Sequence, residues 1–529
     1  MCGIWACIGC PLTKAETIHQ TNRVRGRGPE STEALVLATA TLGFARLALN
    51  DLTPQGMQPF SQGGIHWICN GEIYNWKEVA DRHAFLCLSA SDCSVLGPLW
   101  AKFRDSPETF FRALDGVFAL VLVDEATGLT TVGRDPYGVR PLFYAQGLAC
   151  VYVASEMKAL VGLTKGPIQA VPPGNYLQFE TATGARVRRV AYHAVPWIKN
   201  PAYTHEEVAC AAIKDALVAA VRKRLMTERP VAALLSGGVD SSLIAALVQR
   251  ERKALGKPPL ETFTIGFAGS PDLAFAREAA AWMGSKHTEL VVTPDAFFEA
   301  VPAVIRDIES YDITTVRASV GNWFVARDIR RLSEAKVVFN GDGADEVFGS
   351  YLYCFRAPDD ESYEAEVTRL LSDIHLFDVL RSDRSISSHG LEARTPFLDK
   401  QFVSVVRSVA TSLLRPQKGV RPEKALLRKA FEAEGLLPPS VLWRQKEAFS
   451  DGVSGTSKSW YQEIQDRVPI GAATSTWTHN PPPTAEARYY RTLFDADYGS
   501  PCEQVIPYFW MPRWSGETSD PSARTLSIY

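Results

Sequence analysis

Short runs of apolar residues set the pattern of the amino-terminal part of the chain. Residues 65–69, 117–123, 129–132 and 149–154 are apolar or β-branched, and clusters of Gly, Pro and Asp separate them. Runs of about four to eight such residues between turn-forming clusters are typical of strands. We therefore expect a sheet-rich α+β domain over residues 1–195.

The pattern changes after residue 205. Residues 206–224 and 274–283 are typical of helices, and they alternate with β-branched or apolar runs at 231–235, 262–267 and 336–339. Strands that alternate with helices usually form a parallel sheet with helical crossovers. Residues 205–529 are therefore expected to form an α/β domain around a parallel sheet.

A proline-bearing connector marks the predicted boundary. It reads Val-Pro-Trp-Ile-Lys-Asn-Pro at residues 195–201, and a second irregular stretch at residues 478–483 is expected to be a loop. No internal repeat is present, and 529 residues exceed the usual size of one domain. The sequence therefore predicts two domains.

The composition excludes several classes of protein. Hydrophobic residues make up 46% and charged residues 22%, and 56 basic against 59 acidic side chains give a net charge of -3. A nucleic-acid partner or an anionic membrane surface usually requires a basic excess, so neither is expected. The longest apolar runs, at 117–123 and 148–154, are far shorter than the roughly 18 residues that span a bilayer.

The cysteines and the first residues indicate a cytoplasmic protein. The first basic residue is Lys14, so the positive region of a secretory signal is lacking. Ten cysteines in 529 residues are too sparse for a disulfide scaffold, and we interpret them as reduced. Cys7 and Cys10 form a C-x-x-C pair, but no second pair follows at zinc spacing, which favours a structural role.

Cys2 is a candidate nucleophile. It directly follows Met1, and the next residue is Gly3, which lets a substrate backbone come close. If Met1 is removed, Cys2 carries a thiol and a free α-amine on one residue, and the amine can take the thiol proton. A chance cysteine at position 2 is the alternative, and other residues decide between them.

Four side chains and one backbone group complete a candidate pocket for an amino acid. The Arg46 guanidinium can hold an α-carboxylate, and the carboxylates of Glu72 and Asp92 can hold an α-ammonium. Asn70 and Gly71 follow an apolar run, where an amide and a backbone N–H can stabilise an oxyanion. Glutamine fits such a pocket, because its side-chain carbonyl would face the thiol.

A glycine-rich loop indicates a phosphate site. Residues 231–235 lead into Ser-Gly-Gly-Val-Asp-Ser-Ser at 236–242, and an apolar helical stretch follows. In a strand–loop–helix of this kind, backbone N–H groups and the helix N-terminus face an anion. The Lys of a Walker A loop is absent, so this loop suits a leaving pyrophosphate better than a transferred γ-phosphate.

An acidic loop is expected beside the phosphate loop. Residues 340–346, Asn-Gly-Asp-Gly-Ala-Asp-Glu, follow the apolar run that ends at residue 339. The carboxyl ends of parallel strands share one edge of a sheet, so Asp240 and Asp345 are candidate Mg²⁺ ligands there. A helix N-cap is the alternative role for Asp345.

These motifs resemble the glutamine-hydrolysing asparagine synthetases over nearly the whole chain. The amino-terminal half carries C-G-I-W, R-G-P, N-G-E-I-Y-N, L-D-G-V-F-A and G-R-D-x-Y-G-V-R-P-L-F. The second half carries L-L-S-G-G-V-D-S-S, Y-D-I-T-T-V-R-A-S, E-A-R-T-P-F-L-D, W-R-Q-K-E-A-F-S-D-G and D-P-S-A-R. The resemblance implies a class II glutamine amidotransferase domain, a four-layer α/β/β/α sandwich of antiparallel sheets of the N-terminal nucleophile type. A parallel-sheet synthetase domain of the PP-loop ATP pyrophosphatase type would follow it.

The resemblance assigns roles to single residues. Cys2 is the implied glutaminase nucleophile, and Asn70 and Gly71 form its oxyanion hole. The implied glutamine-binding residues are Arg46, Leu47, Ala48, Leu49, Asn50, Asn70, Gly71, Glu72 and Asp92. The implied ATP-binding residues are Leu235, Ser236, Gly237, Gly238, Asp240, Ser241, Ser242, Ile265, Asn340 and Gly341. Lys424 matches a lysine near the phosphates, and Asp342 matches an acidic residue tied to acyl-adenylate formation.

The implied reaction uses both domains. L-aspartate and MgATP would form β-aspartyl-AMP and pyrophosphate, and ammonia from L-glutamine would convert the adenylate to L-asparagine and AMP. Ammonia in water is mostly protonated and therefore not nucleophilic. The family resemblance implies a dry passage between the sites, which would deliver it unprotonated. It also suggests a homodimer.

Several positions depart from the family pattern. Gly26 and Ala45 stand where histidine is usual, and Glu30 replaces Asp near the glutaminase pocket. In the second half, Asn340, Asp342 and Ala344 replace Ser, Glu and Ser, and Ala425 replaces a histidine beside Lys424. Asp342 keeps the charge on a shorter side chain.

Two other functions are possible on this scaffold. An amide- or lactam-forming relative would use another acceptor, but the lactam-forming relatives lack the N-terminal cysteine that this chain has. A non-catalytic regulatory or storage protein would have lost reactive positions, whereas Cys2, Asn70, Asp240, Asp345 and Lys424 are all present.

Overall fold

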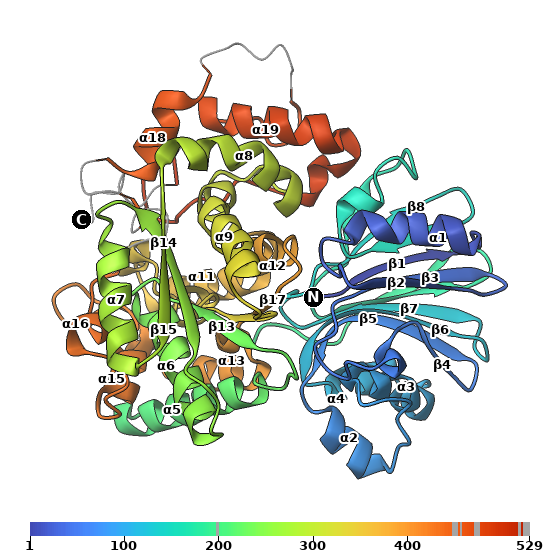
Figure 1. The fold of residues 1–529 in the computed structure, drawn as a ribbon, viewed down its shortest axis with the longest axis horizontal. Coiled ribbons are helices and arrows are strands. Elements are labelled where there is room, and N and C mark those ends of the chain that lie inside the picture. The colour runs from blue at the N-terminus through green and yellow to red at the C-terminus, as the bar shows by residue number, and fades with distance from the viewer. Residues whose placement is uncertain (197–199, 447–452, 455–457, 470–476, 517–519, 522–529) are drawn as a thin grey trace.

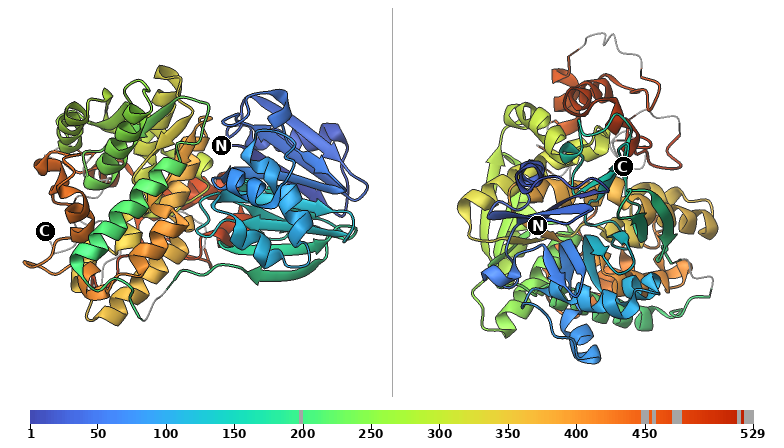
Figure 2. Two further views of the ribbon diagram at one scale, coloured as in Figure 1. Left: turned by 90° about the horizontal axis from the view of Figure 1, so that it is seen from below. Right: turned by 90° about the vertical axis from the view of Figure 1, so that its right-hand side faces the viewer.

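The computed structural model describes residues 1–196, 200–446, 453–454, 458–469, 477–516 and 520–521. Two units lie side by side, and the amino terminus lies at their junction (Figures 1 and 2). Parts of three predicted motifs, at 197–199, 447–452 and 522–524, lie outside the described residues. The irregular stretch predicted at 478–483 lies between two helices and is a loop, as expected.

The amino-terminal unit contains two six-stranded antiparallel sheets. The first sheet has the order β10-β8-β9-β1-β3-β2, and its strands are β1 Gly3–Ile8, β2 Ser31–Val36, β3 Ala40–Arg46, β8 Phe143–Gln146, β9 Val151–Ala154 and β10 Ile168–Ala170. The second has the order β12-β11-β7-β6-β5-β4, and its strands are β4 Phe60–Gln62, β5 Ile65–Ile73, β6 Gly116–Asp124, β7 Leu129–Arg134, β11 Asn175–Glu180 and β12 Arg186–Ala191. The helices are α1 Lys14–Thr21, α2 Trp76–His83, α3 Leu96–Phe103 and α4 Pro107–Ala113.

Alternating side chains build the layers of this unit. Along β6, Leu120 and Leu122 pack in a cluster with α2, α3 and α4, whereas Val121 and Val123 pack against residues of the first sheet. Successive side chains of a strand point to opposite faces, so one apolar strand can join two cores. Helix α1 covers the outer face of the first sheet (Figure 1). The predicted four-layer α/β/β/α sandwich is confirmed.

The carboxy-terminal unit contains a five-stranded parallel sheet in the order β15-β14-β13-β16-β17. Its strands are β13 Val231–Leu234, β14 Glu261–Phe267, β15 Lys286–Val292, β16 Val337–Phe339 and β17 Glu392–Arg394. The helices are α5 Glu206–Lys223, α6 Val239–Ala254, α7 Pro271–Met283, α8 Pro294–Ile308, α9 Ile313–Leu332, α10 Ala344–Phe348, α11 Asp360–Asp373, α12 Asp378–Ser387, α13 Lys400–Arg407, α14 Thr411–Leu414, α15 Ala425–Glu432, α16 Pro439–Leu442, α18 Trp460–Arg467 and α19 Ala485–Tyr498.

Both faces of the parallel sheet are buried at its centre. On β13, Val231 and Ala233 share a core with α5 and α6, and Ala232 shares a different core with α8 and α9. Helices on both faces explain why the central strands β13 and β16 are uninterrupted apolar runs. The predicted parallel sheet with helical crossovers is confirmed.

The two units share their apolar cores. One core joins Leu47, Leu49 and Val139 of the first unit to α5 of the second, and another joins Met1 and Trp5 to Ile386 of α12. All ten cysteines are free in the structure. Across the described ranges, no helix is both long enough and apolar enough to cross a membrane.

Gly97 tests the packing of the amino-terminal unit. A Cβ added at Gly97 in α3 would lie 2.2 Å from the ring of Trp67, which is fully buried. Overpacking of this kind usually costs about 1–3 kcal/mol, so Gly97→Ala should lower the melting temperature by several degrees. Calorimetry measures it against Gly166→Ala, where the nearest atom is 3.8 Å from the added carbon. Equal melting temperatures for the two variants would contradict the packing described.

Candidate functional sites

A cavity of about 260 Å³ opens at the carboxyl edge of the parallel sheet. The loop after β13, the loop after β16 and the start of α15 contribute to its wall. Six of the ten predicted ATP-binding residues line it: Ser236, Gly238, Asp240, Ser241, Asn340 and Gly341. The other four, Leu235, Gly237, Ser242 and Ile265, do not line it.

The phosphate loop is held by its own serines. Ser241 Oγ accepts a hydrogen bond from the Ser236 backbone N–H at 3.0 Å and lies 2.8 Å from Ser236 Oγ. Gly237 has φ +73°, and a Cβ there would lie 2.5 Å from Phe275 Cβ. Only glycine avoids that clash, and the turn directs the first turn of α6 toward the cavity, where it suits an anion.

Lys424 lies between two carboxylates in this cavity. Its Nζ is 2.5 Å from Asp240 Oδ2 and 2.7 Å from Asp345 Oδ1, and Lys446 Nζ is 2.5 Å from Asp345 Oδ2. Burial alone would raise the pKa of Asp345, but Lys424 and Lys446 together hold it far below its ordinary value. The predicted residues Asp240, Asp345 and Lys424 are therefore brought together, as a group of paired charges.

Asp342 lies on the same wall, beside Arg381 of α12. Its Oδ1 is 3.4 Å from Arg381 Nη2, and burial raises the pKa of the carboxyl. The neighbouring Asn340 donates from Nδ2 to Ser382 Oγ at 2.5 Å, so α12 supports both residues of the acidic loop.

The cavity also contains residues that the sequence reasoning did not single out. They are Arg317, Glu346, Tyr351, Asp378, Arg444 and Lys446. Arg317 and Lys446 belong to the motifs Y-D-I-T-T-V-R-A-S and W-R-Q-K, so the motifs signalled them. Nothing in the local pattern distinguished Tyr351 or Asp378 from ordinary structural residues.

A second, smaller pocket lies beside Cys2. Cys2 Sγ accepts from the Leu47 N–H at 3.4 Å, and burial raises the pKa of the thiol to about 11 while Met1 is attached. The Met1 amine donates to Leu391 O at 3.3 Å, and burial lowers its pKa to about 6. The Met1 side chain is thus packed into the junction between the units.

Most predicted glutamine-binding residues line this pocket. They are Arg46, Leu47, Ala48, Leu49, Asn50, Gly71, Glu72 and Asp92, and Asn70 is not among the lining residues. The Asn70 side chain is completely buried, and neither its oxygen nor its nitrogen has a hydrogen-bond partner. A buried amide without a partner is rare in native proteins and calls for a functional explanation.

The two carboxylates of the pocket share one amide donor. Asn50 Nδ2 donates to Glu72 Oε2 at 2.7 Å and to Asp92 Oδ1 at 3.3 Å. Burial, together with nearby acids, raises the pKa of Glu72 well above its ordinary value, and burial raises the pKa of Asp92 to about 6. At neutral pH Asp92 therefore supplies a negative charge in this pocket.

Arg46 and Glu30 hold the loop around the pocket. Arg46 donates to Thr53 O at 2.9 Å and also to Asp51 O. Glu30 accepts from the Ala48 N–H and from Arg229 of the second unit, both at 2.9 Å. The longer side chain at position 30 therefore has a defined role, and Arg46 is occupied by backbone carbonyls in this state.

Sequence comparisons agree with the two sites. Residues 1–203 match the glutamine amidotransferase domain family, and residues 212–369 and 356–498 match the asparagine synthase family. The glutamine-hydrolyzing asparagine synthetase of Gallus gallus is 38% identical over 562 residues, which cover 100% of this chain and 99% of that protein. The proteins of the same name from Mus musculus and Homo sapiens are also 38% identical, with the same coverage. The chain therefore belongs to the family of glutamine-hydrolysing asparagine synthetases.

Proposed function

We propose that this protein makes L-asparagine from L-aspartate and ATP with nitrogen from L-glutamine, releasing AMP, pyrophosphate and glutamate. The observation that carries the proposal is the presence in one chain of a buried thiol pocket and a phosphate-loop cavity, joined by shared cores. Residues 1–195 would form the glutaminase domain and residues 205–529 the synthetase domain.

Once Met1 is removed, Cys2 would act as the nucleophile in the first step, the hydrolysis of glutamine. The Cys2 sulfur attacks the side-chain amide carbon of glutamine, and the new α-amine takes the thiol proton and passes it to the leaving nitrogen. Ammonia departs, and water then cleaves the thioester to give glutamate. The unpaired Asn70 amide and the Gly71 N–H would stabilise the oxyanion, and Asp92 would hold the α-ammonium.

The second cavity would activate aspartate. A side-chain carboxylate oxygen of aspartate attacks the α-phosphorus of ATP, the bond to the bridging oxygen breaks, and pyrophosphate leaves. Ammonia then attacks the acyl carbon of β-aspartyl-AMP, AMP leaves, and the nitrogen loses a proton. The Lys424 ammonium, already at the phosphate loop, would offset the charge on pyrophosphate. Asp342, which also lines this cavity, would act in adenylate formation.

The residues around Lys424 fit a magnesium ion that arrives with ATP. Asp240 Oδ1 is buried without a hydrogen-bond partner, and Asp345 offers a second carboxylate beside the same lysine. Mg²⁺ is usually held by one or two carboxylates and by substrate phosphates. When bound, it would neutralise phosphate charge. Among the described residues no group of three or more His, Cys, Asp or Glu could hold a metal alone, which agrees with a site that substrate completes.

Ammonia would pass between the sites through the junction. The backbone segment from Leu391 to Ala393, next to Met1, is buried. Removal of Met1 would free the space between that segment and Cys2. A cytoplasmic location and a homodimer are further parts of the proposal, supported by the free thiols and by the family, respectively.

The Cys2→Ala variant tests the overall proposal. The wild-type protein with aspartate and MgATP should form asparagine and pyrophosphate from either glutamine or ammonium. Cys2→Ala should lose the glutamine-dependent reaction and keep the ammonium-dependent one, because only the thiol is removed. Mass spectrometry of the active protein should show loss of Met1. A wild-type protein that releases no pyrophosphate with either nitrogen source would exclude aspartate as the acceptor.

Asp92 predicts a pH dependence of glutamine binding. Its carboxyl is ionised above about pH 6 and neutral below it, so the KM for glutamine should rise as the pH falls through 6. Steady-state hydrolysis of glutamine without ATP measures this. Asp92→Asn should have a high KM that no longer changes across this range. A wild-type KM that stays constant from pH 7 to pH 5 would show that Asp92 does not hold the ammonium.

Lys424 predicts a specific loss in the adenylation half. Lys424→Gln should lower ammonium-dependent pyrophosphate release by about 10²–10³-fold and leave glutaminase activity in place. Lys429→Gln is the matched control, because Lys429 is exposed and pairs with Glu206 at 2.7 Å. Equal rates for the two variants would remove Lys424 from the mechanism.

A further inference from the structure

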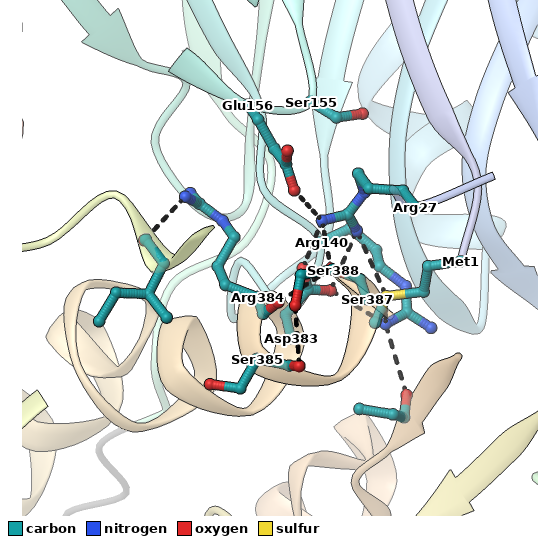
Figure 3. A network of polar contacts seen from close by, with 12 residues as sticks. Met1, Arg27, Arg140, Ser155, Glu156, Asp383, Arg384, Ser385, Ser387 and Ser388 are labelled. Carbon is teal, nitrogen blue, oxygen red and sulfur yellow. Dashed lines mark hydrogen bonds and ion pairs between the residues drawn. The ribbon is translucent and has the colours of Figure 1, made fainter. Parts of the chain in front are cut away.

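Helix α12 extends from the nucleotide cavity to the glutaminase unit. At its first turns, Arg381 pairs with Asp378 at 2.6 Å and with Asp342 at 3.4 Å. Two residues later, Asp383 points toward the amino-terminal unit (Figure 3). A single short helix therefore carries one contact to the proposed adenylation residue and another to the opposite unit.

Asp383 lies between two buried arginines of the glutaminase unit. Its Oδ2 accepts from Arg27 Nη1 at 2.8 Å, and its Oδ1 accepts from Arg27 Nη2 and from Arg140 Nη1, both at 3.3 Å (Figure 3). All three residues are 2% exposed or less. The double contact to one guanidinium fixes orientation as well as distance, because it requires two parallel hydrogen bonds.

Arg27 connects Asp383 to the backbone of Cys2, the proposed nucleophile. Its Nε donates to Cys2 O at 3.0 Å, and its Nη1 also donates to Glu156 and to Ser387 Oγ of α12. One side chain thus separates Asp383 from the backbone of Cys2. The contacts of Arg27 to Asp383 and Ser387 tie it to α12, whereas its contacts to Cys2 and Glu156 lie within its own unit.

We propose that Asp383 is a positioning residue that couples glutamine hydrolysis to asparagine formation through Arg27 and α12. A shift of α12 caused by occupancy of the Asp342 wall would reach Cys2 through two buried contacts. Conversely, a shift of Cys2 would reach Asp342. This inference rests on the proposed function, because it concerns the ratio of the two half-reactions.

The variant Asp383→Asn tests the proposal. The amide keeps the shape of the carboxylate but removes the charge that holds two arginines. The glutamate formed per asparagine formed should rise by about fivefold relative to wild type, while ammonium-dependent synthesis continues. If Asp383 only stabilised the fold, both products would fall together, and the ratio would stay at the wild-type value.

Two further variants keep the result interpretable. Glu364→Gln removes a buried partner of Arg407 within the synthetase unit, so it should lower stability without changing the ratio. Ser387→Ala removes one uncharged contact of Arg27 and should raise the ratio by about twofold, even if Asp383→Asn does not fold. An unchanged ratio in Ser387→Ala and in any folded Asp383→Asn would overturn the coupling. Absence of asparagine from the wild-type reaction would instead overturn the proposed function.

Discussion

Buried arginines at the junction of the two units require carboxylate partners, and this requirement determines how the units dock. Arg27 and Arg140 are completely buried, and each finds an acidic partner, Asp383, on the opposite unit. A buried charge that loses its partner typically costs about 3–5 kcal/mol, so other arrangements of the units are strongly disfavoured. The shared apolar cores bury apolar surface between the units, whereas these ion pairs fix how one unit is oriented against the other. The docking also helps to fix the position of Cys2, because the Cys2 carbonyl accepts a hydrogen bond from Arg27.

Both proposed reaction sites contain buried charged or polar side chains. In the cavity at the phosphate loop, Lys424 and Asp345 form an ion pair, which the phosphates of ATP would perturb in the proposed reaction. Beside Cys2, the buried Asn70 amide has no hydrogen-bond partner, and burial raises the pKa of Asp92 to about 6. Under the proposed function, each site holds groups whose partners would be parts of a substrate. Burying a polar or charged group without a partner costs free energy, and such groups are found at functional sites, where a ligand can supply the missing partner.

Local pattern predicted the strand-rich first unit, the parallel sheet and the phosphate loop, because periodicity and loop chemistry act over short distances. The two-sheet sandwich and the pocket residues at 47–50 came from the resemblance to the family. The docking of the units was not predictable in this way. Arg27 and Asp383 are 356 positions apart, and no local signal joins them. Arg46 lines the pocket beside Cys2, and its role as a carboxylate ligand stays a prediction. Its support of the pocket loop could not be predicted, because it binds backbone carbonyls, which any sequence offers. Ile265 lies outside the cavity wall, because its side chain packs in the core on the α8 and α9 side.

Isotope transfer tests most directly whether ammonia passes from the Cys2 pocket to the second cavity without leaving the protein. The protein would be supplied with aspartate, MgATP and glutamine labelled with ¹⁵N in the side-chain amide. Unlabelled ammonium would be added at a concentration too low to support synthesis alone. The account predicts asparagine with the full ¹⁵N enrichment of the glutamine, measured by mass spectrometry. Enrichment that falls to that of the mixed ammonium pool would show that nitrogen leaves the protein between the sites, and would contradict the account.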